Sequence, residues 1–508
     1  MWVPNYRNRP GRIYVAIADA MADDVAAGRL RPGERLPTHR ELAWHLELSV
    51  STVSKAYALA ARRHLIEGEV GRGTFITSRA SDISRLEPNR AQSDLIDLTF
   101  NCPVQLPAQE QAMAQAMRDI AGGPRLPLLL PYHRDWIGMP EHRAAAARWL
   151  ATRGVTAVAD DVVIVNGGQQ GVSVILSALI EPGETVAAEE LTDPGIKFLA
   201  ANRHLTLRGL PIDGQGLIPD AFEAACRSGP LRALICCPNH QSPTLSVMPV
   251  ERRRAIAEIA MRHDVFVIED DVYGGFIEHA PPSIASFAPE HSYYVTSLSK
   301  IVCPGLRIGF IATPPGRATD LVPGLGATTW MASSLAAEIA CQWIEDGTAE
   351  RLAHLQREEL RKRQLLAAEA LAGQTFRSLP TGLHLWLDLP ETWRAESFVA
   401  QIRTHGAAVT PAEAFAVGHG PSRHAIRVSL GGATPRAPSC RRASTSSPIS
   451  SAAAPPRPTS CFSLQFSHPG ESRYRIHTSD DRPAALPSPC KRSAAGRGKG
   501  PDAQRREG

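Results

Sequence analysis

The pattern of the sequence changes at residue 94, and this change limits the possible folds more than any other feature. From residue 94 to residue 432, short β-rich runs alternate with helical stretches. We expect strands near residues 162–165, 185–187, 233–236, 265–268, 293–296, 308–311 and 425–430. We expect helices near residues 169–180, 251–262 and 335–373. Strands that alternate with helices predict an α/β fold with a mainly parallel sheet.

Three other segments complete the chain. Residues 1–78 predict a helix at 11–28, a short helix capped by Thr38, a helix opened by Ser49 or Ser51, and a hairpin at 67–76. Residues 79–93 are polar and aperiodic, which is typical of a linker. Residues 434–508 contain 11 prolines and few apolar runs, so we expect a low-complexity tail without a core. The α/β domain then spans residues 94–433.

The net charge of +4 is unevenly distributed. Residues 1–80 carry a net charge of +4, residues 434–508 carry +8, and the residues between them carry −8. Two basic ends around an acidic body suggest a nucleic-acid-binding part joined to a part that binds none.

The composition narrows the class of protein further. The chain is 43% hydrophobic, which excludes disorder throughout, and its nine cysteines lack metal-type spacing. We expect no membrane span and no secretory signal, because no apolar run is long enough and residues 1–10 are polar. A cytoplasmic protein with reduced thiols is the expectation.

Residues 36–63 have the pattern of a helix–turn–helix, and Gly71-Arg72-Gly73 forms the tip of the hairpin that follows. The second helix of such a unit enters the DNA major groove with its first residues. The candidate DNA contacts are Arg40, Ser51, Thr52, Lys55 and Arg72. The alternative is an ordinary three-helix unit whose polar residues only face solvent.

A second group of motifs predicts an anion site beside a reactive lysine. Lys300 ends the run Ser297-Leu298-Ser299-Lys300 after a strand, and Arg307 follows it closely. A lysine that forms a Schiff base with a cofactor is held in this way, at a strand end near a phosphate site. The turn Gly167-Gly168-Gln169 joins a strand to a helix, so its backbone N–H groups can bind phosphate.

Asp270 and Tyr273 follow another apolar strand. A carboxylate there can pair with a protonated pyridine nitrogen, and a tyrosine three residues later can bond a phenolic oxygen. Each motif alone is weak, since an Asp pair after a strand often only caps a helix, but their order along the chain is a strong signal.

Two resemblances connect these motifs to known families. Arg35 to Ala43, Ser51-Thr52-Val53 and Gly71 to Phe75 resemble the winged helix of GntR-type repressors, which implies operator binding as a dimer. Residues 94–432 resemble the fold-type I aminotransferases. This second resemblance implies pyridoxal 5′-phosphate as cofactor, with Lys300 as the Schiff-base lysine, Asp270 as the pyridine partner and Tyr273 as the phenolate partner.

The same resemblance assigns the remaining site residues. It implies that Ser297, Arg307 and the turn Gly167-Gly168-Gln169 bind the phosphate. It also implies that Tyr132 reaches the phosphate of the partner subunit and that Arg427 binds the carboxylate of a substrate or effector. Ser242 stands where relatives usually have Asn, and Asp193 stands where they usually have an aromatic ring.

The two modules together resemble the MocR-type regulators of the GntR superfamily, which are commonly domain-swapped dimers. The resemblance implies a transcription regulator that senses the cofactor, or an amino compound that forms an external aldimine with it. Two alternatives stay open: an active aminotransferase with an accessory DNA-binding module, and a DNA-binding protein with a vestigial domain. The tail after residue 433 has two explanations, a shifted reading frame or a basic arm that adds DNA affinity.

Overall fold

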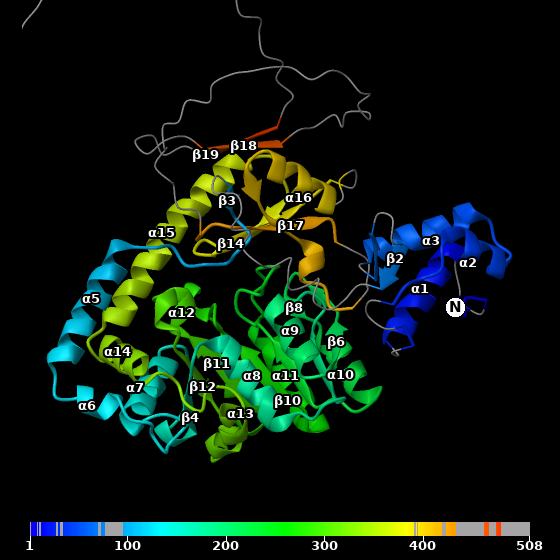
Figure 1. Ribbon diagram of the computed structural model, residues 1–508. Helices are drawn as coiled ribbons and strands as arrows, with labels where there is room; N and C mark the ends of the chain where they lie inside the picture. The colour runs from blue at the N-terminus through cyan, green and yellow to red at the C-terminus, as the bar shows by residue number, and fades with distance from the viewer. Residues whose placement is uncertain are drawn as a thin grey trace, which may run out of the picture.

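The N-terminal domain consists of three helices and a two-stranded hairpin (Figure 1). The computed structural model describes residues 2–7, 9, 12–26, 29–30, 34–63, 65–69, 73–76, 95–390, 393, 395–418, 423–432, 462–466 and 474–478. The domain contains α1 (Ile13–Ala26), α2 (His39–Leu46), α3 (Val50–Arg62), β1 (Ile66–Glu69) and β2 (Gly73–Ile76). The two strands pair antiparallel, which confirms the expected hairpin.

The start of each helix in the helix–turn–helix is fixed by a side chain. Thr38 and Glu41 form a capping box on α2, with a bond of 2.7 Å from the Thr38 backbone N–H to Glu41 Oε2. The Ser49 hydroxyl accepts a bond from the Thr52 N–H, so Ser49 and not Ser51 caps α3. Leu42, Val53 and Tyr57 are buried against α1, as the apolar spacing predicts.

A seven-stranded sheet forms the centre of the large domain (Figure 1). Its strand order is β4-β12-β11-β10-β9-β5-β6. Strand β12 is antiparallel to both of its neighbours and every other pairing is parallel, so the sheet is mainly parallel, as expected. The strands are β4 (Val162–Val165), β5 (Thr185–Glu189), β6 (Thr206–Leu210), β9 (Ala233–Cys236), β10 (Phe266–Asp270), β11 (Ser292–Ser297) and β12 (Gly309–Ala312).

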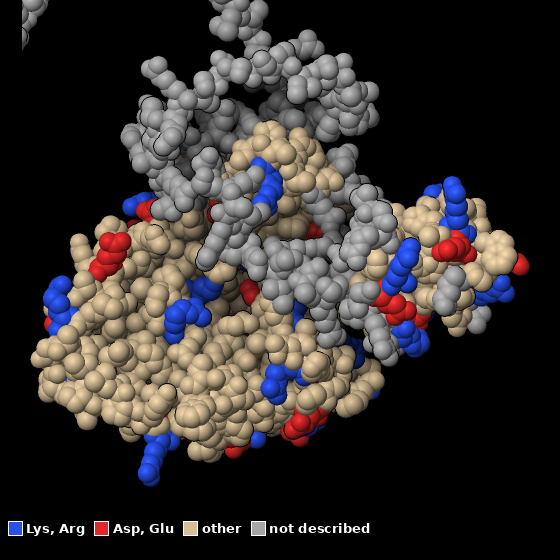
Figure 2. All heavy atoms as spheres, viewed as in Figure 1, with Lys and Arg blue, Asp and Glu red and all other residues tan. Residues whose placement is uncertain are grey.

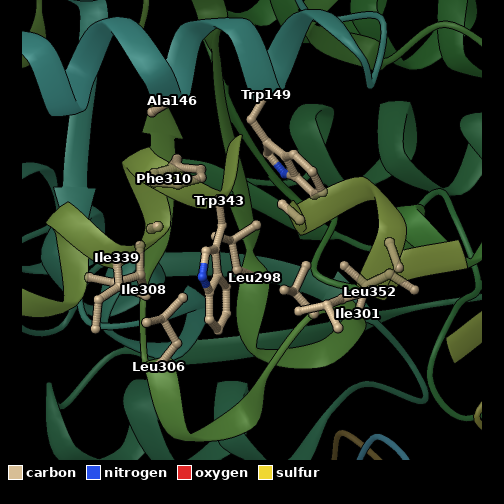
Figure 3. Packing of buried hydrophobic residues seen from close by; sticks show 14 of the residues in the cluster. Ala146, Trp149, Leu298, Ile301, Leu306, Ile308, Phe310, Ile339, Trp343 and Leu352 are labelled. Carbon is tan, nitrogen blue, oxygen red and sulfur yellow. The ribbon is translucent and has the colours of Figure 1, made fainter. Parts of the chain in front are cut away.

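Helices cover both faces of this sheet because successive strand residues point to opposite sides. Val162 and Ile164 pack in a cluster with α7 and α14, whereas Val163 and Val165 pack with α8 and α13. Figure 3 shows Trp149 and Ala146 of α7 close to Phe310, Leu298 and Ile301 in the first cluster. The helices of this domain are α5 (Pro107–Gly122), α6 (Leu126–Leu129), α7 (Pro140–Ala151), α8 (Gly168–Leu179), α9 (Pro194–Asn202), α10 (Pro219–Arg227), α11 (Val250–His263), α12 (Leu298–Ile301), α13 (Val322–Gly326) and α14 (Ser334–Glu345).

The long helix α15 (Thr348–Ala370) leads to a small domain with a four-stranded sheet in the order β13-β14-β17-β16 (Figure 1). Leu385, Leu387 and Ile426 from this sheet pack against Phe398 of α16. The elements are β13 (Phe376–Arg377), β14 (His384–Asp388), α16 (Ala395–Thr404), β16 (Thr410–Pro411) and β17 (Ala425–Ser429). Two short ribbons complete the described elements: β3 (Ile96–Asp97) with β15 (Ala407–Ala408), and β7 (Ile212–Asp213) with β8 (Gly216–Leu217).

Within the tail, the structure describes only β18 (Phe462–Phe466) and β19 (Tyr474–Thr478), which pair antiparallel. Neither strand was expected from the low-complexity composition of this segment. The linker at 79–93 and the rest of the tail lie outside the described residues. Among the described helices, none is long and apolar enough to cross a membrane.

Candidate functional site

The candidate DNA contacts lie at the starts of α2 and α3. Arg40, Ser51 and Lys55 are exposed, and Thr52 is half-buried. His39 Nδ1 lies 3.0 Å from Ser54 Oγ, which ties the two helices together. The exposed side chains lie on the first turns of α2 and α3, whereas Arg72 lies outside the described residues.

Lys300 lies on α12, directly after the central strand β11. Ser297 caps this short helix, because its hydroxyl accepts a bond from the Ser299 N–H at 3.0 Å. The Lys300 Nζ donates a bond of 2.8 Å to the backbone oxygen of Asn101. Burial lowers the pKa of Lys300 below its usual value. A lowered pKa makes it easier for the lysine to lose its proton, and Schiff-base chemistry requires the neutral amine.

Asp270 is the last residue of β10, and its Oδ1 atom is buried without a hydrogen-bond partner among the described residues. Burial, together with the nearby charge of Asp193, raises the pKa of Asp270 to about 7. A buried acceptor without a donor is costly, so the site suits a ligand that brings a proton to this oxygen. A protonated pyridine nitrogen is such a donor.

Tyr273 is buried beside Lys300. Its ring centroid lies 5.6 Å from Lys300 Nζ and 5.2 Å from the ring of His240, which stacks on it. Burial raises the pKa of Tyr273, so its hydroxyl keeps its proton and can donate a bond to a phenolic oxygen.

The turn Gly167-Gly168-Gln169, the expected phosphate site, packs closely against its neighbours. Gly167 has a φ of 87°, which favours glycine, and a Cβ atom there would lie 3.0 Å from Arg307 Nη2. A Cβ atom at Gly168 would lie 2.3 Å from Val272 Cγ1. The backbone of this turn therefore approaches the Arg307 guanidinium and the end of β10 as only glycine allows. The turn lies at the N-terminus of α8, where backbone N–H groups can bind an anion.

The two remaining expected phosphate ligands already have partners in this structure. The Ser297 hydroxyl donates to the Ile308 backbone oxygen at 2.9 Å, and Gln169 Nε2 donates to the Gly195 oxygen at 3.0 Å. The buried Ser299 hydroxyl, in contrast, has no partner among the described residues. The family resemblance implied Ser297, and the bonding partners of the two hydroxyls distinguish them.

Arg427 lies on β17 and is buried. Its Nη2 donates to the Thr99 backbone oxygen at 2.7 Å, and its guanidinium carbon lies 4.6 Å from the Phe415 ring centroid. The Nη1 atom donates a hydrogen bond of 3.4 Å to the hydroxyl oxygen of Ser242. The Nε atom has no partner among the described residues, which leaves a donor for a carboxylate.

Sequence reasoning missed a polar network behind these residues. The Asn101 side chain contacts His384 Nδ1 at 3.1 Å, and His384 Nε2 contacts the Pro243 oxygen at 3.0 Å. His240 Nε2 accepts a bond from the Leu383 N–H. Burial lowers the pKa of His240 to about 4. The ring is therefore neutral when it accepts this bond and when it stacks on Tyr273. The members come from distant parts of the chain, and no local motif signals them.

Tyr132 is not among the other site residues in this protomer. Its side chain is exposed, and its ring centroid lies 5.8 Å from that of Trp330, which stacks on Trp136.

Figure 2 shows basic side chains, with an acidic one beside them, at a hollow in the centre of the face shown.

Two family models match the chain. The model for aminotransferase class I and II matches residues 94–440, and the model for bacterial regulatory proteins of the gntR family matches residues 13–76. These matches cover the two domains that the structure describes.

Two relatives are matched over most of their length. The chain is 30% identical to the HTH-type transcriptional regulator YdeF of Bacillus subtilis, over 84% of this chain and 92% of the relative. It is 28% identical to the vitamin B6 salvage pathway transcriptional repressor PtsJ of Salmonella typhimurium, over 83% and 94%.

The fold is similar to that of solved aminotransferases. The multiple substrate aminotransferase of Thermococcus profundus superposes with a TM-score of 0.63 at 22% identity, over 70% of this chain and 91% of that one. At this identity the likeness shows the fold alone, the fold-type I architecture with its mainly parallel sheet.

Proposed function

Because the chain belongs to the aminotransferase class I and II family and carries a gntR-family domain before it, the architecture of MocR-type regulators, we propose that it regulates transcription in response to a ligand at Lys300. The DNA-binding domain binds operator DNA through Arg40, Ser51, Thr52, Lys55 and Arg72. Such a regulator acts on the chromosome, so we propose that it is cytoplasmic.

Pyridoxal 5′-phosphate is the proposed cofactor, and the residues of the site fit it. Asp270 offers an unpartnered buried oxygen to the pyridine nitrogen. Arg307 and the turn Gly167-Gly168 offer donors to the phosphate. The cofactor supplies an aldehyde that condenses reversibly with amines, and this is the chemistry by which an amino compound is sensed.

The effector is an amino compound with a carboxylate. Arg427 binds the carboxylate with planar, paired donors. Lys300 bonds Asn101 and Arg427 bonds Thr99, two residues earlier in the same segment. Burial lowers the pKa of Lys300, which raises the fraction of neutral amine available to exchange with an incoming amine.

One observation carries the regulatory part of the proposal. Lys300 and Arg427, the two ligand-facing cations, both bond the backbone of residues 99–101. This segment follows β3, the first described element after the linker that leads to the DNA-binding domain. A ligand that takes over both side chains removes two bonds from the segment and shifts the populations of its conformations.

An active aminotransferase with an accessory DNA-binding module is the second candidate. Lys300, Asp270 and Arg427 are all in place for it. Against efficient catalysis, Asp193 provides no ring to stack on the cofactor, and Ser242 bonds Arg427.

Absorbance spectroscopy tests the shared premise. The purified protein is expected to be yellow with pyridoxal 5′-phosphate, and borohydride should fix the cofactor to the wild type but not to Lys300→Ala. Lys362→Ala, which changes an exposed lysine on α15, is the matched control. Rapid turnover of amino acids with 2-oxo acids, without a specific DNA footprint, would favour the enzyme instead.

The proposed assembly is a homodimer, domain-swapped as in MocR-type proteins. Tyr132 and Trp330 are exposed aromatic side chains that form a contact on the surface of the protomer. A partner subunit would cover them and bring Tyr132 to its own phosphate site.

A further inference from the structure

A second cavity lies apart from Lys300, where the end of α7 meets α14 and the start of α15. Its volume is about 440 Å³, within the range of small-molecule sites. Its lining consists of Arg148, Trp149, Thr152, Arg153, Ile277, Glu278, Ile344, Ala349, Glu350 and Arg357. The family motifs at Lys300 use none of these residues.

Two nearly buried arginines form the inner wall of this cavity. The Arg153 guanidinium carbon lies 4.5 Å from the ring centroid of Trp149, on which it stacks. Arg357 donates to the Gly275 backbone oxygen at 3.1 Å. Burial lowers the pKa of Arg153, and the nearby charge of Glu350 opposes this shift.

The two arginines share one carboxylate. Glu350 Oε1 lies 2.5 Å from Arg357 Nη2, whereas Glu350 Oε2 lies 3.5 Å from Arg153 Nη2. The Nη2 atom of Arg153 and the Nε atom of Arg357 are buried without a hydrogen-bond partner among the described residues. Asp271 also attracts Arg153, but its oxygens accept bonds from Tyr294 and Asn239.

The charges at the rim are already paired. Arg148 lies 2.6 Å from Glu345, and Glu278 lies 3.2 Å from Arg361, with all four side chains exposed or half-exposed. Exposed ion pairs of this kind contribute little to the balance of charge inside the cavity. The inner wall therefore holds two cations against one nearby carboxylate, beside the apolar side chains of Ile277 and Ile344.

We propose that this cavity is a second ligand site, which binds a small anion through Arg153 and Arg357. A carboxylate or phosphate group supplies the acceptor oxygens that planar guanidinium groups bind best. The proposal rests on this cavity and does not depend on the proposed function.

The cavity also has a short structural connection to Lys300. Arg357 bonds Gly275, and a Cβ atom at Gly275 would lie 3.1 Å from Ile301, the neighbour of Lys300. Figure 3 shows Trp149, from the cavity wall, and Ile301 in the same packed cluster. An anion bound here contacts the framework that positions the lysine.

Calorimetric titration of the full chain with inorganic phosphate, and separately with succinate, tests the proposal. The protein is first saturated with pyridoxal 5′-phosphate and dialysed into phosphate-free buffer. We expect saturable binding that weakens about tenfold or more in Arg153→Gln, because a hydrogen bond to a charged group contributes about 1.5–3 kcal/mol. Glu350→Gln is expected to tighten binding several-fold, because it removes the competing carboxylate.

Two further variants separate this site from its alternatives. Arg307→Gln changes the phosphate turn near Lys300 and should leave this binding unchanged, and exposed Arg118→Gln should do the same. Binding lost in Arg307→Gln but kept in Arg153→Gln would assign the anion to the cofactor site and overturn the proposal. Absence of saturable binding of both anions, or unchanged affinity in Glu350→Gln, would also overturn it.

Discussion

Lys300 and Arg427 donate hydrogen bonds to the same three-residue segment, Lys300 to the Asn101 oxygen at 2.8 Å and Arg427 to the Thr99 oxygen at 2.7 Å. The lysine comes from the large domain and the arginine from the small domain. The segment is thus held from both sides, and both holding groups face the proposed ligand. Under the proposed function, a ligand that engages both side chains would couple its binding to the position of this segment through these two bonds.

The buried carboxyls predict a pH dependence of stability in the cofactor-free protein. Burial raises the pKa of Asp270 and of Glu269 to about 7, and that of Glu189 to about 8. Their pKa values in the unfolded chain are near 4, so the native state binds more protons at intermediate pH. Stability therefore falls as pH rises toward 8.

His240 and His384 act in the opposite direction below about pH 6.5, since burial lowers their pKa values. The clear window is pH 6.5 to 8. Across it the melting temperature and the free energy of unfolding should fall as pH rises. In Asp270→Asn the free energy of unfolding should fall less steeply, by up to about 1.4 kcal/mol per pH unit. The exposed Asp160→Asn is the control. A flat profile in the wild type would contradict the burial of these charges.

By the resemblance to fold-type I aminotransferases, Asp193 stands at the position of a ring that stacks on the cofactor. Its Oδ1 caps α9 by accepting a bond from the Gly195 N–H at 2.8 Å. Asp193→Asn keeps a capping oxygen and removes the charge, so the pKa of Asp270 should fall. Asp193→Tyr adds a ring and should strengthen cofactor binding several-fold, despite the lost cap.

Fluorescence titration with pyridoxal 5′-phosphate measures both effects. Weaker binding in Asp193→Tyr than in the wild type would show that the side chain does not face the cofactor. A pH titration of Asp193→Asn with the same readout follows the change at Asp270.

The helix–turn–helix predicts separable contributions to DNA binding. Arg40→Ala and Lys55→Ala should each weaken binding and lower the salt slope by about one unit, if each contacts a phosphate. Ser49→Ala should instead destabilise the domain by about 1 kcal/mol, because it removes the cap of α3. Gel-shift titrations at several salt concentrations distinguish these outcomes. Arg118→Ala, in the other domain, should change neither the affinity for DNA nor the stability of the DNA-binding domain.

The exposed aromatic pair predicts a subunit interface. Trp330→Asp should shift the protein toward monomers in analytical ultracentrifugation, because a charge would be buried in the contact. Trp44, which is also exposed but lies on α2, provides the matched substitution Trp44→Asp. Equal sedimentation of both variants and the wild type would place the interface elsewhere.

The sequence predicted the framework because local signals specify it. Val162–Val165 and Ala233–Cys236 are short apolar runs between turns, and both are strands with the expected bounds. The strand expected at 265–268 instead continues to Asp270, because its parallel pairing with β11 extends that far. Motif order was sufficient to place Lys300, Asp270 and Tyr273 close together.

The contacts between distant segments could not be predicted in this way. The side chains of Asn101 and His384 form a hydrogen bond although 283 residues separate them. Arg153 forms an ion pair with Glu350 of α15, which is also distant in the sequence. Which hydroxyl near Lys300 remains free also depends on the capping geometry of α12, where Ser297 bonds the backbone and Ser299 does not. These details depend on tertiary packing and carry no sequence period.

The most direct test of the regulatory account is a footprint on the DNA upstream of the gene, at 150 mM salt, with and without pyridoxal 5′-phosphate. Wild-type protein and Lys300→Ala are compared at equal concentration. The account predicts that the cofactor changes the affinity or the extent of the footprint in the wild type and has no effect in Lys300→Ala. An identical wild-type footprint in both conditions, or the same response in Lys300→Ala, would contradict it.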